Sequence, residues 1–366
     1  MSSAPEAPRG ALRIGAVAGV PVYLERTWLV LAVLIAVLGY QSGAVRGPQT
    51  AVAYAAWLVV SIFVAVVGHE SGHALAARAL GFRVHRIVAT LWGGHTAYDA
   101  TGATPWRTAL VALAGPAVNG VLALVGWVAA AVVGGVATSF AVAFAFLNVL
   151  LAVFNLLPGL PLDGGAAVQS LVWGVTGRRD RGLLVAGWCG RVVAVLVVLW
   201  VVGRPVLAGG LPDIVNLVVA VVMGWILWSG ASAAIQRAPL ERVIDTVRVG
   251  DAAQPVLVLP LDATVDQVRS QGQVVVCEDD TGRPTLLVPS EIPPETPPIA
   301  SLRSVVLRIA DGNVVEAEPG SGITPVLQAM GTSRYPVVVL TRGGRAWGVV
   351  TAAAIDAAAK RAGAHT

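Results

Sequence analysis

The residues best suited to chemistry lie between Val67 and Arg78, in the segment VGHESGHALAAR. His69 and His73 are four positions apart, and on a helix this spacing places both imidazoles on one face, where they could bind one metal ion. Glu70 would lie beside that metal, where a carboxylate can accept a proton from a metal-bound water. This H-E-x-x-H pattern predicts a catalytic zinc site, and the alternative is a structural pair of histidines.

The sequence that leads into this motif is apolar enough to enter a membrane. Residues 51–67 carry no charged side chain. The whole chain is 56% hydrophobic and 13% charged, which is more apolar than a soluble domain of this length requires. Ionisable groups at membrane depth are costly and usually mark a functional site. We therefore expect a multi-pass protein of the cell membrane, with the lipid bilayer as part of its solvent.

The distribution of charge predicts how the chain is oriented in the membrane and argues against one class of partner. Six segments have the length and composition of membrane spans, at roughly 27–44, 51–80, 108–134, 139–156, 183–203 and 214–235. Arginines gather before the first span and after the second, fourth and sixth, whereas the alternate loops hold only Arg46 and Arg204. This asymmetry predicts that both chain ends are cytoplasmic. Arg191 lies inside the fifth segment, so either that span begins later or the arginine faces the helix bundle.

The net charge of the chain is +4, and no basic patch is visible in the sequence. A nucleic-acid-binding protein would need such a patch, so the sequence argues against a nucleic-acid partner.

Two other regions favour strands. Residues 11–25 are rich in glycine and valine, and residues 81–106 contain the alternating run FRVHRIV. The pair Gly93 and Gly94 marks a turn between short strands near the membrane surface. His95 follows this pair, and we expect a lone loop histidine to be solvated.

The fourth span ends in a segment that cannot continue a helix, NLLPGLPLDGG from Asn155 to Gly165. Unwound backbone at membrane depth is tolerated only where protein or a water-filled cavity surrounds it. Asp163 lies in this break and should emerge on the same side as the two histidines, which makes it the best candidate for a third metal ligand. A set of two imidazoles and one carboxylate would leave a fourth position for water. The alternative is that Asp163 caps the next helix or lies in a solvated loop.

The third span contains the segment AGPAVN, from Ala114 to Asn119. Gly115 permits close contact between helices, and Asn119 is a polar group that needs a partner in lipid.

The composition changes after Arg237. Residues 240–366 contain most of the acidic residues and no membrane-length run, and apolar β-branched stretches alternate with helix-like segments. We therefore predict a membrane-embedded domain over residues 1–239 and a small cytosolic α/β domain over residues 240–366. The predicted fold class is a polytopic α-helical membrane protein, with about six transmembrane helices and short membrane-associated strands, followed by this domain.

Together these motifs resemble the site-2 protease family of intramembrane zinc metalloproteases. The resemblance covers roughly residues 12–235 and rests on GHESGHA, AGPAVN and FNLLPGLPLDGG. It implies one zinc ion per chain and hydrolysis of a peptide bond within or near a substrate's transmembrane helix. It also implies that His69, His73 and Asp163 are the zinc ligands and that Glu70 is the catalytic acid and base.

The same resemblance suggests auxiliary residues. Asn119 and Asn155 match polar positions close to the family's site. The segment around Gly93 and Gly94 matches a region that holds substrate in extended form. A helical peptide bond is shielded by its own hydrogen bonds, so the substrate must unwind, and pairing with a strand would stabilise it.

The C-terminal domain resembles a pair of CBS (cystathionine β-synthase-type) repeats. The clearest match is RYPVVVLTRGGRAWGVVT, from Arg334 to Thr351. Such pairs often bind adenine nucleotides through an acidic residue three positions after the final threonine, and this chain has Ala354 there while Asp356 is out of register. This departure argues against a nucleotide ligand. We expect a regulatory or dimerising role, with homodimers formed through these modules.

Three functions compete at this point. An active protease would cut a transmembrane protein, such as an anti-sigma factor or another signalling precursor, in regulated intramembrane proteolysis. A CBS-gated metal-ion transporter or channel would use the intramembrane histidines and aspartate to pass an ion, but it leaves Glu70 without a role, and no related pair of repeats with corresponding broken helices is visible. A catalytically inactive relative would bind membrane segments without cutting them.

Overall fold

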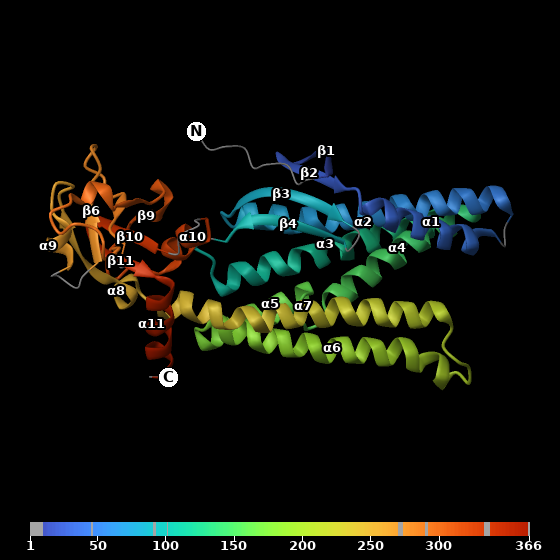
Figure 1. Cartoon of the computed structure of the whole chain (residues 1–366). Helices are drawn as coiled ribbons and strands as arrows, with labels where there is room; N and C mark the ends of the chain where they lie inside the picture. The colour runs from blue at the N-terminus through green and yellow to red at the C-terminus, as the bar shows by residue number, and fades with distance from the viewer. Residues whose placement is uncertain are drawn as a thin grey trace. The chain divides into compact units, whose positions relative to one another are not determined.

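The computed structural model describes residues 10–44, 47–90, 93–100, 102–269, 274–289, 292–332 and 337–364. The chain divides into two compact units, Met1–Ala238 and Pro239–Thr366, and Figure 1 shows their helices and strands.

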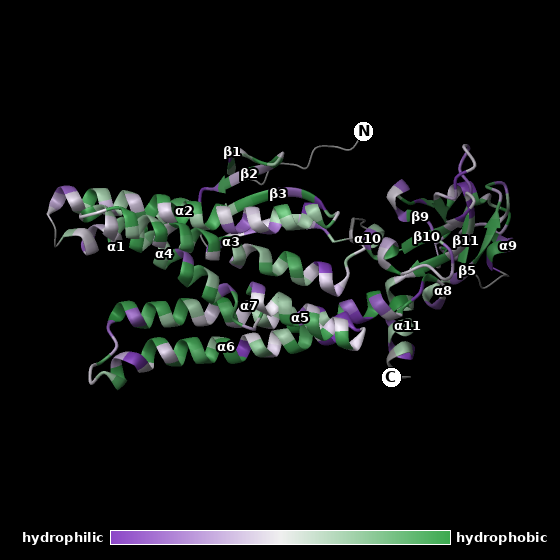
Figure 2. Ribbon diagram, turned by 180° about the vertical axis from the view of Figure 1, so that it is seen from behind, coloured by the Kyte–Doolittle hydropathy of each residue, from purple (hydrophilic) through white to green (hydrophobic). Residues whose placement is uncertain are grey.

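The first unit is mainly helical. Its helices are α1 (Trp28–Gly43), α2 (Pro48–Ala79), α3 (Pro105–Val132), α4 (Val136–Asn155), α5 (Asp163–Thr176), α6 (Arg179–Leu207) and α7 (Ile214–Thr246), the last of which runs past the boundary between the units. In the described part of the chain, five of them are long and apolar enough to cross a membrane: α2, α3, α4, α6 and α7. Apolar residues colour most of the length of these helices in Figure 2.

The first expected span is shorter than the others. α1 has 16 residues, which is about 24 Å of helix against a hydrocarbon core of about 30 Å. The described residues thus give five long apolar helices and one shorter one, and the count of six spans stays a prediction.

Small residues allow the helices that carry the site to pack closely. A Cβ at Gly72 of α2 would lie 2.7 Å from the carbonyl oxygen of Ala114 on α3, and a Cβ at Gly126 of α3 would lie 2.9 Å from the Cα of Ala145 on α4. Such separations are too short for any side chain, so these glycines are needed for the close approach of the backbones. This approach brings polar groups of α3 and α4 up to the histidine-bearing face of α2.

A four-stranded sheet lies against α2, as Figure 1 shows. Its strands are β1 (Ala11–Val17), β2 (Val20–Glu25), β3 (Arg83–Thr90) and β4 (Gly93–Asp99), in the order β1-β2-β3-β4. The β2–β3 pair is parallel and the two hairpins are antiparallel, which confirms the strands expected in residues 11–25 and 81–106. One detail was wrong. Gly93 and Gly94 are the first two residues of β4 rather than the turn, because Gly93 and Gly94 pair with Thr90 and Ala89 and so continue the ladder.

The predicted helix break after α4 is present, and its backbone lies close to the start of α5. Between Asn155 and Asp163 the chain is not helical. A Cβ at Gly165 would overlap the backbone of Gly159 and Leu160, and a Cβ at Gly164 would overlap the backbone of Leu156. These two glycines let the start of α5 fold back on the loop that precedes it, which fixes where α5 begins.

The second unit contains a seven-stranded sheet in the order β8-β7-β6-β5-β11-β10-β9. Its strands are β5 (Gln254–Leu259), β6 (Val274–Cys277), β7 (Leu286–Leu287), β8 (Leu307–Arg308), β9 (Val314–Glu316), β10 (Val337–Arg342) and β11 (Arg345–Thr351). Its helices are α8 (Val249–Ala252), α9 (Val265–Arg269), α10 (Thr324–Thr332) and α11 (Ala352–Ala364).

The second unit repeats one arrangement. The run β5-α9-β6-β7 and the run β9-α10-β10-β11 each have a parallel strand pair across the helix and then an antiparallel pair. Part of the segment that resembles a CBS repeat, residues 334–336, lies outside the described residues. The rest of it, from Val337 to Thr351, forms the β10–β11 hairpin.

Candidate metal centre

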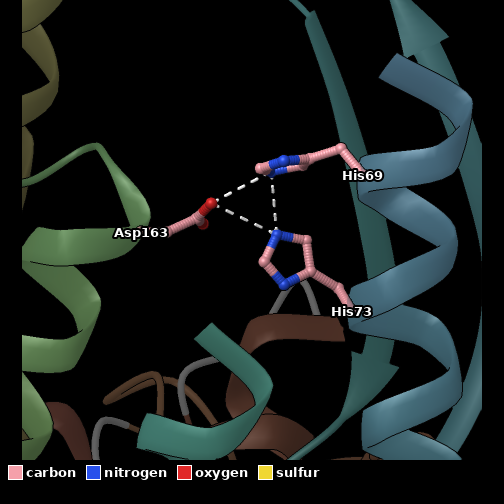
Figure 3. Close-up of side chains that lie close together, drawn as sticks. All are labelled: His69, His73 and Asp163. Atoms are coloured by element: carbon pink, nitrogen blue, oxygen red, sulfur yellow. Dashed lines mark hydrogen bonds and ion pairs between the residues drawn. The ribbon is translucent and has the colours of Figure 1, made fainter. Parts of the chain in front are cut away.

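Two helices bring three ligand atoms together, as Figure 3 shows. His69 Nε2 on α2 lies 3.0 Å from Asp163 Oδ2, and His73 Nε2 lies 3.3 Å from the same oxygen. The two Nε2 atoms are 3.0 Å apart. The histidines meet because residues four apart share a helix face, and Asp163 reaches them because it is the first residue of α5, directly after the helix break.

The opposite nitrogen of each imidazole has its own hydrogen bond. His69 Nδ1 lies 2.6 Å from Asn119 Oδ1. The amide nitrogen of Asn119 donates to the carbonyl of Ala65 at 3.1 Å and to Asn148 Oδ1 at 2.9 Å, so the oxygen of Asn119 must be the atom that faces His69, and His69 Nδ1 donates to it.

His73 has the same arrangement with a backbone partner. Its Nδ1 lies 2.7 Å from the carbonyl oxygen of Val111, which can only accept. In the neutral form of each imidazole the proton is therefore on Nδ1, and Nε2 presents a lone pair. Metal-binding histidines are commonly oriented in this way by a partner on the other ring nitrogen.

These atoms fit a zinc ion. With both imidazoles neutral, two Nε2 lone pairs and a carboxylate oxygen lie 3.0–3.3 Å from one another, and a bound cation would offset their mutual repulsion. Asp163 Oδ2 is buried and has no hydrogen-bond partner among the described residues. Two imidazole nitrogens and one carboxylate oxygen are a known ligand set of open, catalytic zinc sites.

Glu70 lies on the same turn of α2 as His69, and a residue of the sheet binds its carboxylate. It is 6% exposed. The hydroxyl of Thr96 on β4 lies 2.8 Å from Glu70 Oε2 and 3.0 Å from the Glu70 carbonyl oxygen, and it can donate to either. A Cβ at Gly94 would lie 2.5 Å from Glu70 Cγ and 2.8 Å from Oε1. The glycine thus leaves room for the carboxylate, and the threonine orients it.

A cavity of about 240 Å³ opens over these groups, and Glu70, His73 and Asp163 line it. β4 supplies one wall, which includes His95 and Tyr98. Burial raises the pKa of the Tyr98 phenol above its ordinary value. His95 lies on β4 rather than in a loop, because it pairs with Val88 across the hairpin. Its side chain is exposed, as we expected, although it borders the cavity.

The predicted auxiliary residues are placed differently from one another. Asn119 is fully buried and holds His69. Asn155 is the last residue of α4, and its amide donates to the Leu151 carbonyl at 3.0 Å within its own helix. Gly94 abuts Glu70, and Gly93 begins β4 with a φ of 113°.

The sequence interpretation missed two residues of this site. Asn148 is fully buried and accepts from Asn119, and Thr96 binds Glu70. Asn148 carried a usable signal, because it is a polar residue in an apolar span, seven positions before Asn155 and on the same helix face. Thr96 carried none, since threonine is common in strands.

Comparisons with known proteins find matches to peptidases. The family model described as Peptidase family M50 matches residues 57–137 and 129–199. The chain is 32% identical over 252 residues to sll0528 of Synechocystis, a protein named as a zinc metalloprotease. This match covers 67% of the chain and 65% of sll0528. It is 36% identical over 190 residues to Rip3 of Mycobacterium tuberculosis, also named as a zinc metalloprotease, over 50% of this chain and 47% of Rip3.

The site-2 protease from Methanocaldococcus jannaschii aligns with 62% of this chain and 95% of that chain, at 22% identity and a TM-score of 0.45. This chain spans 65% of the length of sll0528 and 47% of Rip3. The long apolar helices and the site define a polytopic membrane protein with a metal centre. Over residues 57–199 the chain is similar to peptidase family M50, and its cofactor is zinc.

Proposed function

We propose that this protein is a zinc-dependent endopeptidase that hydrolyses a peptide bond in or near a transmembrane segment of another membrane protein. The observation that carries the proposal is the convergence of His69 Nε2, His73 Nε2 and Asp163 Oδ2 within 3.3 Å of one another, with the carboxylate of Glu70 held beside them by Thr96. A transporter site has no need of an oriented carboxylate next to the ligand set.

The residues of the chain have separate tasks in this reaction. His69, His73 and Asp163 would hold zinc, which as a Lewis acid polarises a carbonyl and lowers the pKa of an attacking water. Glu70 takes the proton of that water and returns it to the leaving amine. Because Thr96 binds Oε2, Oε1 is the oxygen better placed to receive the proton. The buried setting of the ligand set strengthens these electrostatic interactions.

β4 supports an extended mode of substrate binding. It is at the end of the strand order in its sheet, so its outer edge can pair with another strand. Gly94 and Thr96 on this strand contact Glu70, so a substrate added to β4 would pass next to the carboxylate. Such pairing would replace the backbone hydrogen bonds that the substrate loses when its helix unwinds.

The test is the substitution Glu70→Gln in cells. We expect new protein N-termini that map inside transmembrane helices in membranes with wild-type protein and not in membranes with the variant, while purified variant retains its zinc. These termini would also name the substrate, which we propose is an anti-sigma factor or another signalling precursor. If metal flux rather than a peptide product depends on Glu70, the protein is a transporter. If neither changes, it is an inactive binder.

We further propose that the second unit regulates the enzyme or joins two copies of it. The repeated strand–helix–strand–strand arrangement supports an internal pair of CBS-like modules. No ligand is assigned to it, because Ala354 occupies the position where such modules carry an acidic residue. Co-purification of two differently tagged full-length chains tests the dimer, and a purely monomeric chain would contradict it.

A further inference from the structure

Arg191 is a cation in an apolar helix that the proposed reaction does not use. It lies on α6, in a run from Gly182 to Gly203 that contains no other charged residue. Its Nη2 donates to Ser232 Oγ on α7 at 3.2 Å, and among the described residues this is its only hydrogen bond. Its Nε is buried without a partner, and no carboxylate of the described chain lies within ion-pair distance. A charge at such a position is costly unless an anion accompanies it.

The surroundings of the guanidinium determine which anion could reach it. Its carbon lies 4.6 Å from the ring centre of Trp188 and 5.0 Å from that of Trp228. Both indoles lie within cation–π distance of the guanidinium, and its N–H edge is the part that can hydrogen-bond a further ligand. That edge is the part of arginine that binds phosphate through paired, charge-assisted hydrogen bonds. Trp188 and Trp228 are 56% and 46% exposed, so this position is at the lipid-facing surface of the helix pair.

An apolar groove of about 360 Å³ continues from this position along α6 and α7. Trp228 belongs both to the groove and to the arginine site, and Ala194 and Val195 begin the groove one turn of α6 beyond Arg191. The residues that line it are all apolar or glycine: Ala194, Val195, Val198, Leu199, Gly224, Trp225 and Trp228. A cation that can bind phosphate lies at the end of an apolar groove that can hold an acyl chain. Together they match the two parts of a glycerophospholipid.

We propose that α6 and α7 bind one anionic glycerophospholipid. Its phosphate lies on Arg191 and Ser232, and one acyl chain lies in the groove. A second copy of this chain fits less well, because it would have to present an exposed acid from an apolar helix. Among the five long apolar helices up to Ala238, the acidic residues are Glu70 and Asp180, and both are buried.

The experiment measures lipid binding to the purified full-length chain. Delipidated protein is titrated with phosphatidylglycerol and, separately, with phosphatidylcholine, and bound lipid is counted by native mass spectrometry. We expect one tightly bound phosphatidylglycerol per chain, weaker phosphatidylcholine, and no displacement by millimolar inorganic phosphate, since phosphate alone lacks the acyl contact. Arg191→Gln should weaken phosphatidylglycerol binding at least about tenfold, because it removes charge-assisted hydrogen bonds.

Two further variants separate the parts of the site. Val195→Phe fills the groove and leaves Arg191 in place, and it should also weaken phosphatidylglycerol binding. Arg204→Gln removes an exposed arginine from the other end of the same helix, and it should bind lipid like the wild type. Zinc content of each variant confirms that the protein is folded. Equal lipid binding by wild type and Arg191→Gln would overturn the proposal, as would full displacement by inorganic phosphate. It would also be overturned by a dimer that forms without lipid and is lost in Arg191→Gln.

Discussion

The interaction between Asn119 and His69 should control how tightly zinc is bound. The substitution Asn119→Leu keeps the branched shape and the number of heavy atoms of the side chain and removes its amide. His69 Nδ1 then loses the acceptor at 2.6 Å, in a position where Asn119 is fully buried and water cannot replace it. An unpaired buried donor costs about 1–3 kcal/mol. The ring is also free to rotate or to move its proton to Nε2, the atom that binds the metal.

The expected loss of zinc affinity follows from these terms. Loss of the group that orients a metal-binding histidine lowers affinity by about 10- to 100-fold, which corresponds to about 1.4–2.7 kcal/mol and agrees with the cost of the unpaired donor. The assay is competition for zinc between the purified protein and a chelator of known affinity. Asn155→Leu is the matched control, because its amide bonds within its own helix, and its zinc affinity should equal that of the wild type. A folded Asn119→Leu variant with wild-type affinity would refute the assigned orientation of His69.

Three further predictions concern Glu70 and the second unit. Gly94→Ala should abolish cleavage with zinc retained, because the new Cβ would lie 2.5 Å from Glu70 Cγ, and normal activity in a protease assay would contradict this. Thr96→Val should lower the turnover rate about tenfold or more while Thr96→Ser restores it, since only the hydroxyl binds Glu70; equal rates for Val and Ser would exclude the hydrogen bond. In the second unit, Asp279 accepts hydrogen bonds from Thr281 and the Arg283 amide, and Glu316 accepts them from Thr341 and the Gly343 amide. These bonds hold both pKa values below their ordinary values of 3.8 and 4.5. The stabilisation that these two ionised carboxylates give the folded second unit is therefore complete above about pH 5. It is lost as the pH falls through the lowered pKa values. Labelling of the buried Cys277 thiol by dithiodipyridine in a Cys189→Ser chain should accelerate below about pH 4, and less so in Asp279→Asn. A rate that does not change with acid would show that these carboxylates do not stabilise this unit.

The sequence predicted the parts of the site that depend on local geometry. Residues four apart on a helix share a face whatever the fold, so His69 and His73 could be paired without any structure. Asp163 could be added because prolines and glycines end the helix before it and the expected topology returns it to the same side. Asn119 was a candidate because a buried amide in a membrane helix needs a partner.

The remaining parts depend on how distant segments pack, and no local pattern specifies that. Thr96 reaches Glu70 only because Thr96 pairs with Ile87 across the hairpin and β3 pairs with β2 over α2. A shift of one residue in this register would turn Thr96 to the opposite face of the sheet. Asn148 reaches Asn119 because Gly126 lets α3 and α4 approach closely. The series of hydrogen bonds from Asn148 through Asn119 to His69 therefore depends on Gly126, which lies two turns of α3 away from Asn119. We infer that the packing of α3 against α4 tunes the metal centre although α4 contributes no ligand.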